Sequence, residues 1–285
     1  EPRAKPCLFL SSSQDSVALM GADSSSVVQI PGIIQARMSS SRLPGKVLLP
    51  LVGRPVIEHI VARVEAAEWV SKAWVATSDH QSDDPIAAWC EEKQVNCFRG
   101  SLDDVLDRFS SLAESLGTPW VLRVTGDCPV VDPKILDTVI VEAQKGLFDA
   151  CGLHGDFPNG LDCTVFSLSA LRAANRGAEL PSEREHVGPY ILNRPELFRI
   201  HPVELFTDLR HHRWTLDEPA DYDLLSLLYQ HLYGTDPLFG AESILGLIER
   251  RPWLARLNAD IVRGEGFLPS LLRDEEYRSN QGRQS

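Results

Sequence analysis

The chain has 285 residues, of which 43% are hydrophobic and 24% charged, an ordinary composition that fits one large α/β domain or two small ones. Its net charge of −12 argues against a general nucleic-acid binder, because neutralising backbone phosphates requires a basic surface. The six cysteines show no CxxC spacing, so neither a zinc knuckle nor a disulfide scaffold is indicated, and a reducing, cytoplasmic setting is expected. No apolar run is long enough to predict a membrane span.

Both ends of the chain are predicted to lie outside the folded domain. The sequence opens on Glu1 and stays polar and serine-rich to Ser26, without the cationic start and continuous apolar core of a signal peptide. We expect a flexible extension over residues 1–26, one domain over 27–272 and a polar tail or linker over 273–285. Such ends fit a processed chain or a domain cut from a longer fusion protein.

The first half of the chain alternates short apolar runs with amphipathic segments. The apolar runs predict strands at residues 27–34, 72–77, 95–98 and 120–125. The amphipathic segments predict helices at residues 56–64, 85–93, 103–116 and 133–145. This alternation indicates an α/β fold with a mainly parallel sheet that helices cover on both faces.

The second half has a less regular pattern. A turn at 157–160 leads to a predicted strand at 161–166 and a helix at 167–175. Another helix is expected to open at Glu183 and to end before Pro195. The last predicted elements are a strand end at 214–217 and helices at 220–233 and 244–257.

The loop after the first strand carries an unusual density of cations. Arg37, Arg42 and Lys46 lie within about ten residues of one another, among serines and a glycine. Small residues let backbone N–H groups approach an anion, and Arg and Lys add charge and further donors. Ligands of parallel sheets bind where the strands end, which is where this loop begins. The loop therefore fits a triphosphate or other polyanion, with a solvated basic loop as the alternative.

Two lone carboxylates follow predicted strands. Asp127 stands in Thr-Gly-Asp-Cys-Pro and Asp217 in Trp-Thr-Leu-Asp-Glu-Pro. Either one fits a Mg²⁺ ligand, because that ion prefers oxygen donors, and either one also fits a helix N-cap. Two such carboxylates beside a cationic loop suit a nucleoside triphosphate. The site would not be a P-loop, because no GxxxxGK[ST] pattern occurs.

Several ordered motifs resemble a known family, the cytidylyltransferases that activate acidic sugars. They include the CMP-sialic acid and CMP-KDO synthetases, and the resemblance is strongest to the spore coat polysaccharide biosynthesis protein F group. The motifs lie at residues 34–46, 98–101, 104–109, 123–129, 160–162, 184–187 and 216–221. The resemblance implies a three-layer αβα nucleotidyltransferase fold, Rossmann-like and glycosyltransferase-A-like. It also implies a reaction in which CTP and an acidic acceptor give CMP-acceptor and pyrophosphate.

The resemblance further implies roles for individual residues. Catalytic contacts to the triphosphate would come from Arg37, Arg42 and Lys46. The nucleotide would also contact Ala36, Ser39, Ser40, Ser41, Thr77, Arg99, Gly100 and Ser101. Mg²⁺, the expected cofactor, would be held by Asp127 and Asp217. The acceptor would contact Asp162, Arg184 and His186. Catalysis would then consist mainly of alignment and charge stabilisation.

Some of these positions also have simpler interpretations. His186 lies near a helix start, where Glu183 or Glu185 would satisfy its ring. Arg108 follows Asp107 and is interpreted as half of a helix-surface ion pair rather than as a ligand.

The acceptor and the surroundings of the domain stay open at this stage. A sugar acid and a small phosphonate both carry an anion that Arg184, Arg210 or Arg213 would bind. A plain helix after residues 78–81 differs from the longer acceptor segment usual in CMP-KDO synthetases, and relatives occur fused to phosphonate-pathway enzymes. The family is commonly homodimeric. A glycosyltransferase is disfavoured because Asp127 stands alone rather than in an Asp-x-Asp motif, and a non-catalytic nucleotide-binding domain is disfavoured by the intact cations and carboxylates.

Overall fold

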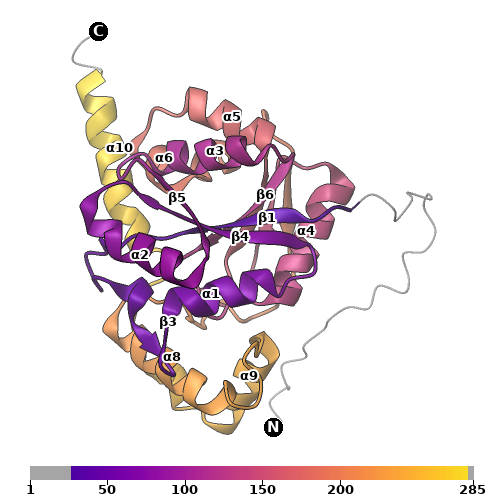
Figure 1. Cartoon of the computed structure of the whole chain (residues 1–285), viewed down its shortest axis with the longest axis vertical. Helices are drawn as coiled ribbons and strands as arrows, with labels where there is room; N and C mark the ends of the chain where they lie inside the picture. The colour runs from indigo at the N-terminus through magenta and orange to yellow at the C-terminus, as the bar shows by residue number, and fades with distance from the viewer. Residues whose placement is uncertain (1–26, 282–285) are drawn as a thin grey trace, which may run out of the picture.

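The computed structural model describes residues 27–281, so the predicted extension over 1–26 lies outside the described residues. A seven-stranded sheet forms the centre of the molecule, in the order β5-β4-β1-β6-β8-β7-β9 (Figure 1). The strands are β1 (Ile30–Gln35), β4 (Val70–Ser78), β5 (Asn96–Gly100), β6 (Trp120–Thr125), β7 (Ala150–Leu153), β8 (Cys163–Ser167) and β9 (Ile200–Val203). Two short strands, β2 (Pro50–Leu51) and β3 (Arg54–Pro55), form a separate hairpin.

Strands β5, β4, β1 and β6 are mutually parallel, as the alternation of strands and helices predicts. Strand β8 runs antiparallel to both β6 and β7, and β9 pairs in parallel with β7. The sheet is therefore mainly parallel, and the α/β prediction is confirmed. Strands β7 and β9 were not predicted, and the expected strand end at 214–217 joins no sheet: its neighbour Arg213 makes a single bridge to Asn159.

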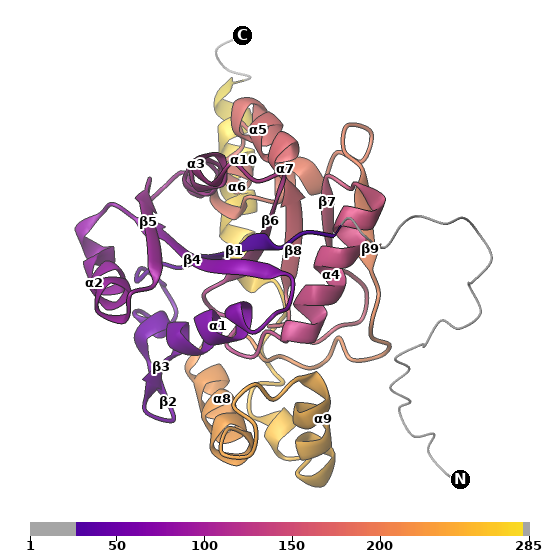
Figure 2. The same ribbon diagram turned by 45° about the vertical axis from the view of Figure 1, so that its right-hand side comes forward.

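Helices cover both faces of the sheet (Figures 1 and 2). One face carries α3 (Val105–Leu116), α5 (Leu168–Gly177), α6 (Pro181–His186) and α7 (Pro189–Leu192). The other carries α1 (Val56–Glu65), α2 (Asp84–Lys93) and α4 (Pro133–Gly146), with α8 (Pro219–Leu232) and α9 (Ala241–Arg250) packed beyond them. The helix α10 (Leu268–Gln281) packs against α6. None of the helices in this described part of the chain has the length and apolarity needed to cross a membrane.

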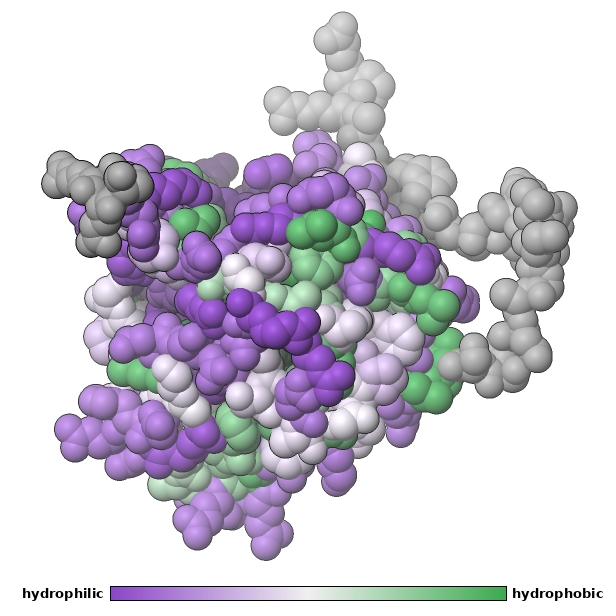
Figure 3. Space-filling model, turned by 90° about the horizontal axis from the view of Figure 1, so that it is seen from above, coloured by the Kyte–Doolittle hydropathy of each residue, from purple (hydrophilic) through white to green (hydrophobic). Residues whose placement is uncertain are grey.

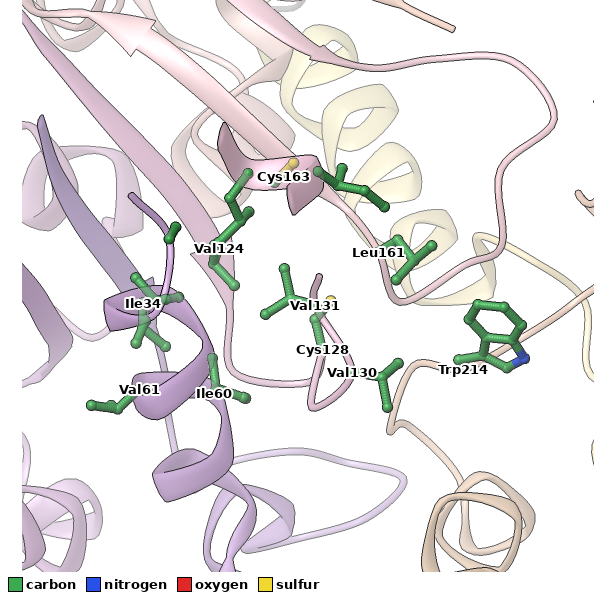
Figure 4. Packing of buried hydrophobic residues seen from close by; sticks show 14 of the residues in the cluster. Ile34, Ile60, Val61, Val124, Cys128, Val130, Val131, Leu161, Cys163 and Trp214 are labelled. Carbon is green, nitrogen blue, oxygen red and sulfur yellow. The ribbon is translucent and has the colours of Figure 1, made fainter. Parts of the chain in front are cut away.

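Two cores form because successive strand residues point to opposite faces of a sheet. Ile34 of β1 packs in the core beneath α1 and α4, whereas its neighbour Ile33 packs beneath α3 and α5. Figure 4 shows the turn after β6, with Cys128, Val130 and Val131 held among core side chains. Because this turn is anchored by buried apolar residues, the polar residue that precedes Cys128 is held at the end of the sheet.

The face of the molecule over α3 and α5 is mostly polar. Viewed from above the α3 and α5 layer, hydrophilic side chains cover much of this face, and hydrophobic ones occur in small separate groups (Figure 3). This distribution is the one expected of amphipathic helices that bury one face against a sheet.

Three predicted helices differ from those observed. The helix opening near Glu183 is divided, because Val187 has a positive φ of 65° between α6 and α7. The closing helix α9 ends at Arg250 instead of 257. The expected polar tail from residue 273 is instead part of α10, where buried Asp274 accepts hydrogen bonds from the amide (2.9 Å) and hydroxyl (2.6 Å) of Ser182. The folded domain therefore continues past residue 272.

Candidate active site

Two adjoining cavities open where β1 and β6 end, with volumes of about 330 Å³ and 320 Å³. The first borders the loop after β1 and is called the loop cavity here; the second is called the distal cavity. Residues lining both are Arg42, Arg123, Thr125, Asp127, His186, Asp217, Glu265 and Gly266. The shared residues mean that ligands bound in the two cavities would be in contact or nearly so.

Lys46 lies between the two predicted metal ligands. Its Nζ is 3.1 Å from Asp127 Oδ2 and 2.7 Å from Asp217 Oδ1. Burial by itself would lower the pKa of the Lys46 ammonium, but the two carboxylates outweigh burial and raise that pKa. Burial likewise opposes ionisation of Asp127, yet the Lys46 charge and a 2.5 Å hydrogen bond from the Thr125 hydroxyl lower its pKa to about 2. Lys46 and Asp127 are therefore both charged near neutral pH.

The N-cap alternative for both carboxylates is wrong. The N-cap residue of α4 is Asp132 and that of α8 is Glu218, so Asp127 and Asp217 are free to face the cavities. Two carboxylates suit Mg²⁺ when phosphate oxygens and water supply the other ligands. Within residues 27–281, no set of three or more His, Cys, Asp or Glu side chains is placed to hold a metal ion by itself. The Mg²⁺ site stays a prediction, and the two carboxylates of Asp127 and Asp217 fit it.

The cationic loop borders the loop cavity, as expected from its position. Arg42 is 3.3 Å from Asp217 and 3.1 Å from Glu218, and Arg37 is 3.3 Å from Glu185. Three further predicted residues, Ala36, Ser40 and Ser41, also line this cavity, whereas Ser39 does not.

A buried acid that the sequence did not single out fixes the start of the cationic loop. Asp83 Oδ1 accepts a 2.7 Å hydrogen bond from the Met38 amide, and its Oδ2 accepts from the amide and hydroxyl of Ser78. One carboxylate thus joins the ends of β1 and β4 and uses both of its oxygens to do so.

The other predicted nucleotide contacts lie away from both cavities. Thr77 is fully buried in β4, and Arg99 donates to the Ser78 carbonyl at 2.8 Å and to Asp84 at 2.7 Å. Gly100 and Ser101 follow at the end of β5, and none of these four residues lines either cavity. The structure does not bring them to the site, so their contact with nucleotide stays a prediction.

Arg184, predicted on the acceptor side, is also placed elsewhere. Its guanidinium donates to the Ala178 and Asn175 carbonyls, both at 2.9 Å, and to Asp104 at 3.2 Å. These contacts tie α6 to α3 and α5, and the residue lines neither cavity. The Arg184 guanidinium is therefore held by protein groups and is not open to an anionic acceptor.

The remaining acceptor candidates do line the distal cavity. Asp162 accepts a 2.9 Å hydrogen bond from the Gly160 amide, and burial raises its pKa. His186 Nε2 is 2.9 Å from the Ser270 hydroxyl, which itself donates to Glu185 at 2.8 Å. The partner of the histidine is thus Ser270 of α10, and burial lowers the His186 pKa to about 4, so the ring is neutral at pH 7.

Two arginines at the distal cavity were not predicted. Arg123 lies on β6, lines both cavities and donates only its Nε, to Gln35 Oε1 at 3.2 Å, within the described residues. Arg263 lines the distal cavity, stacks on Phe157 at 4.5 Å and donates to the Phe157 carbonyl at 2.7 Å. A charged residue inside the apolar run 120–125 was a usable signal for Arg123, but no local pattern marks Arg263.

A family model described as Cytidylyltransferase matches residues 32–213, more than half of the chain. The chain belongs to the cytidylyltransferase family. This membership makes it a CTP-dependent nucleotidyltransferase and confirms the resemblance found in the sequence motifs. The match ends at residue 213, so Asp217 and the 263–269 segment of this cytidylyltransferase lie beyond it.

Individual relatives agree with the assignment of this cytidylyltransferase. The spore coat polysaccharide biosynthesis protein SpsF of Bacillus subtilis (strain 168) is 36% identical over 227 residues, covering 77% of this chain and 94% of that protein. A 3-deoxy-manno-octulosonate cytidylyltransferase of Geobacter metallireducens is 30% identical over 113 residues, covering 40% of this chain and 44% of that protein. A cytidylyltransferase structure from Leptospira borgpetersenii superposes with a TM-score of 0.75 and 28% identity over 83% of this chain and 100% of that one.

Proposed function

We propose that this enzyme transfers CMP from CTP to an acidic small molecule, a sugar acid, with release of pyrophosphate. The observation that carries the proposal is that the loop cavity and the distal cavity meet at Asp127 and Asp217. A nucleotide in the loop cavity would place its phosphates beside these carboxylates, and an acceptor in the distal cavity would approach from the other side. Group transfer requires that the two substrates be held next to each other, and the carboxylates shared by the two cavities mark where they would meet.

The residues of the loop cavity supply charge for this chemistry. Arg37, Arg42 and Lys46 would bind the triphosphate and stabilise the charge that builds on departing pyrophosphate. Asp127 and Asp217 would hold Mg²⁺, which when bound adds positive charge at the phosphates. An acceptor oxygen forms the new bond to the α-phosphorus, and the bond between that phosphorus and the bridging oxygen of pyrophosphate breaks.

Two arginines of the distal cavity are placed to receive the anionic group of an acceptor. Arg213 borders this cavity, but its Nε and Nη2 each lie 2.8 Å from a carboxylate oxygen of buried Asp221, so it is committed to the protein. Arg123 and Arg263 have no such bidentate partner within the described residues. We therefore assign the acceptor's carboxylate to Arg123 and Arg263, and a hydroxyl of the acceptor to Asp162. The relative that acts on 3-deoxy-manno-octulosonate supports a sugar acid.

Pyrophosphate release measured with each of the four ribonucleoside triphosphates tests the proposal. The assay is run with Mg²⁺ against one panel of sugar acids and one of small phosphonates. We expect turnover with CTP and with sugar acids. Equal turnover with UTP or GTP would contradict cytidylyl transfer, whereas turnover only with phosphonates would keep the reaction and replace the acceptor class.

A further inference from the structure

Arg37 is the one cation of the loop whose partner lies on α6. Its Nη2 is 3.3 Å from Glu185 Oε1, and its side chain has no other hydrogen bond or ion pair in the described part of the chain. The side chain is 44% exposed, so the core does not fix its orientation. Lys46 and Arg42 are held instead by Asp217, one of the predicted Mg²⁺ ligands. The direction of Arg37 therefore depends on Glu185.

A like charge nearby opposes the position of Arg37. Arg108 of α3 borders the loop cavity and is only 1% exposed, so its interpretation as half of a helix-surface ion pair is wrong. Asp107, the supposed partner, accepts instead from Asn175 at 3.1 Å. Burial lowers the pKa of the Arg108 guanidinium, and the positive charge of Arg37 lowers that pKa further. The two cations repel each other, and Glu185 supplies the negative charge that holds Arg37 beside the cavity.

Glu185 is in turn held by the helix α10. Its Oε2 accepts a 2.8 Å hydrogen bond from the Ser270 hydroxyl and a charged hydrogen bond from Arg273 Nη2. The single proton of the Ser270 hydroxyl goes to Glu185, so the 2.9 Å contact with His186 Nε2 is an N–H that donates to Ser270. The Glu185 carboxylate thus uses Oε1 for Arg37 and Oε2 for α10.

The charge of Glu185 has to be balanced, because this residue lines the loop cavity. Burial opposes ionisation of Glu185, but the Ser270 hydrogen bond and the two nearby arginines outweigh burial and lower its pKa. An unbalanced carboxylate in this wall would repel a triphosphate. Arg273 does not line the cavity, yet its charge acts on Glu185 from behind. With Arg37 and Arg273 on one carboxylate, the group as a whole stays positive.

Arg37 keeps donors for a ligand while it is held. Only its Nη2 contacts Glu185, so Nε and Nη1 are not engaged by any of the described residues. A guanidinium presents several N–H donors in a fixed fork, and one of them is enough to orient it. Arg213 shows the contrast, because both its Nε and its Nη2 are taken by Asp221, each at 2.8 Å. Glu185 therefore orients Arg37 without occupying it.

We propose that Glu185 is a positioning residue for the triphosphate, held in place by Ser270 and Arg273 of α10, an inference that rests on the proposed function. Arg37 is the group that touches the phosphates, in the part of CTP that leaves as pyrophosphate. Ser270 and Arg273 lie outside residues 32–213, which the family model matches. Nucleotide binding in this enzyme therefore depends on a helix beyond the matched part of the chain.

Titration calorimetry with CTP and with CMP, in Mg²⁺ and without acceptor, tests the role of α10. Arg273→Met should lose about fivefold or more in CTP affinity, because Glu185 is then neither balanced nor held. CMP affinity should change by less than about twofold, since CMP lacks the phosphates that leave. The variant should fold, because Arg273 is 49% exposed and the pair of Ser182 and Asp274 still anchors α10. Arg278→Met, on the exposed surface of the same helix, is the control and should bind both nucleotides as wild type does.

Equal losses for CTP and CMP in Arg273→Met would mean that α10 supports the whole site without acting on the phosphates, and would overturn the proposal. Unchanged affinity for both nucleotides would overturn it as well. Failure of the proposed function is recognised separately, in wild type, which would then neither bind CTP nor release pyrophosphate from it with any acceptor.

A double-mutant cycle tests whether Arg273 acts through Glu185. Glu185→Gln should itself lose about fivefold or more in CTP affinity, because a neutral amide holds Arg37 less firmly. In the Glu185→Gln background, Arg273→Met should change CTP affinity by less than about twofold, since the charge that it balances is gone. Additive losses would show that Arg273 acts independently of Glu185 and overturn the proposal. Wild-type CTP affinity in Glu185→Gln would do the same.

Discussion

The loop cavity and the distal cavity adjoin one another but are assembled differently. The loop cavity comes mainly from turns that directly follow β1 and β6 and from the buried face of α3, with the end of α6 and residues 265–269 completing its wall. The acid at Asp83 ties its first turn to β4. The distal cavity is formed by residues 159–162, 213–217 and 263–267, which meet only through tertiary packing. Under the proposed function, nucleotide binding would depend on the parallel sheet and acceptor choice on the segments that close over it. Acceptor preference can then change without disturbing the nucleotide end.

The largest effect is expected where the two cavities share a carboxylate. Asp127→Ala removes one of the two predicted Mg²⁺ ligands and one partner of Lys46, so pyrophosphate release should fall by about 10³-fold or more. The fold should persist, because Lys46 keeps its contact with Asp217 and the buried turn at Cys128 is unchanged. Melting temperature and turnover are measured together, with the surface variant Glu58→Gln as control. Near-normal turnover would remove Asp127 from the reaction.

Most of the loop cavity was predictable because its residues follow apolar strands directly. The pattern of buried strands identified the ends of β1 and β6, and the cations and carboxylate placed there do line the cavity. Arg108 was misread because an adjacent acid suggested a surface pair, although the helical spacing pointed inward. Arg99 and Gly100 were assigned to the nucleotide from their motif. In the structure, Arg99 donates to Asp84 and Gly100 packs against Arg108.

The distal cavity was less predictable for a physical reason. Asp162 and His186 belong to recognisable motifs, but Arg263 reaches the cavity only because α10 packs on α6 and brings the preceding segment across. That packing depends on the buried pair of Ser182 and Asp274, whose sequence separation hides it from any local pattern. The same packing explains why the region after residue 272, expected to be a tail, is folded.

A substitution confined to the distal cavity tests more sharply whether the two cavities act separately. Arg263→Met should raise the KM for the sugar acid about 10- to 100-fold, because a charged hydrogen bond to its carboxylate is lost. The KM for CTP should change by less than about threefold, since Arg263 does not border the loop cavity. Initial rates at varied acceptor and CTP give both constants, and Arg256→Met, on the exposed surface, is the control. Equal increases in both KM values would show that the two ends are not separable.

The smallest effect concerns stability in acid, through a histidine that both cavities share. Burial lowers the pKa of His186 to about 4, while an unfolded histidine titrates near about 6.5. Between these pH values the unfolded chain binds the proton and the folded chain does not, so the free energy of unfolding falls as pH falls. The free energy of unfolding is measured by urea at pH 7 and at pH 4.5. In His186→Gln the decrease between these two pH values should be smaller by about 1 to 2 kcal/mol. Some slope remains, because burial also lowers the pKa of His212 to about 4. An unchanged slope in His186→Gln would mean that this ring is not the group that resists protonation where the cavities meet.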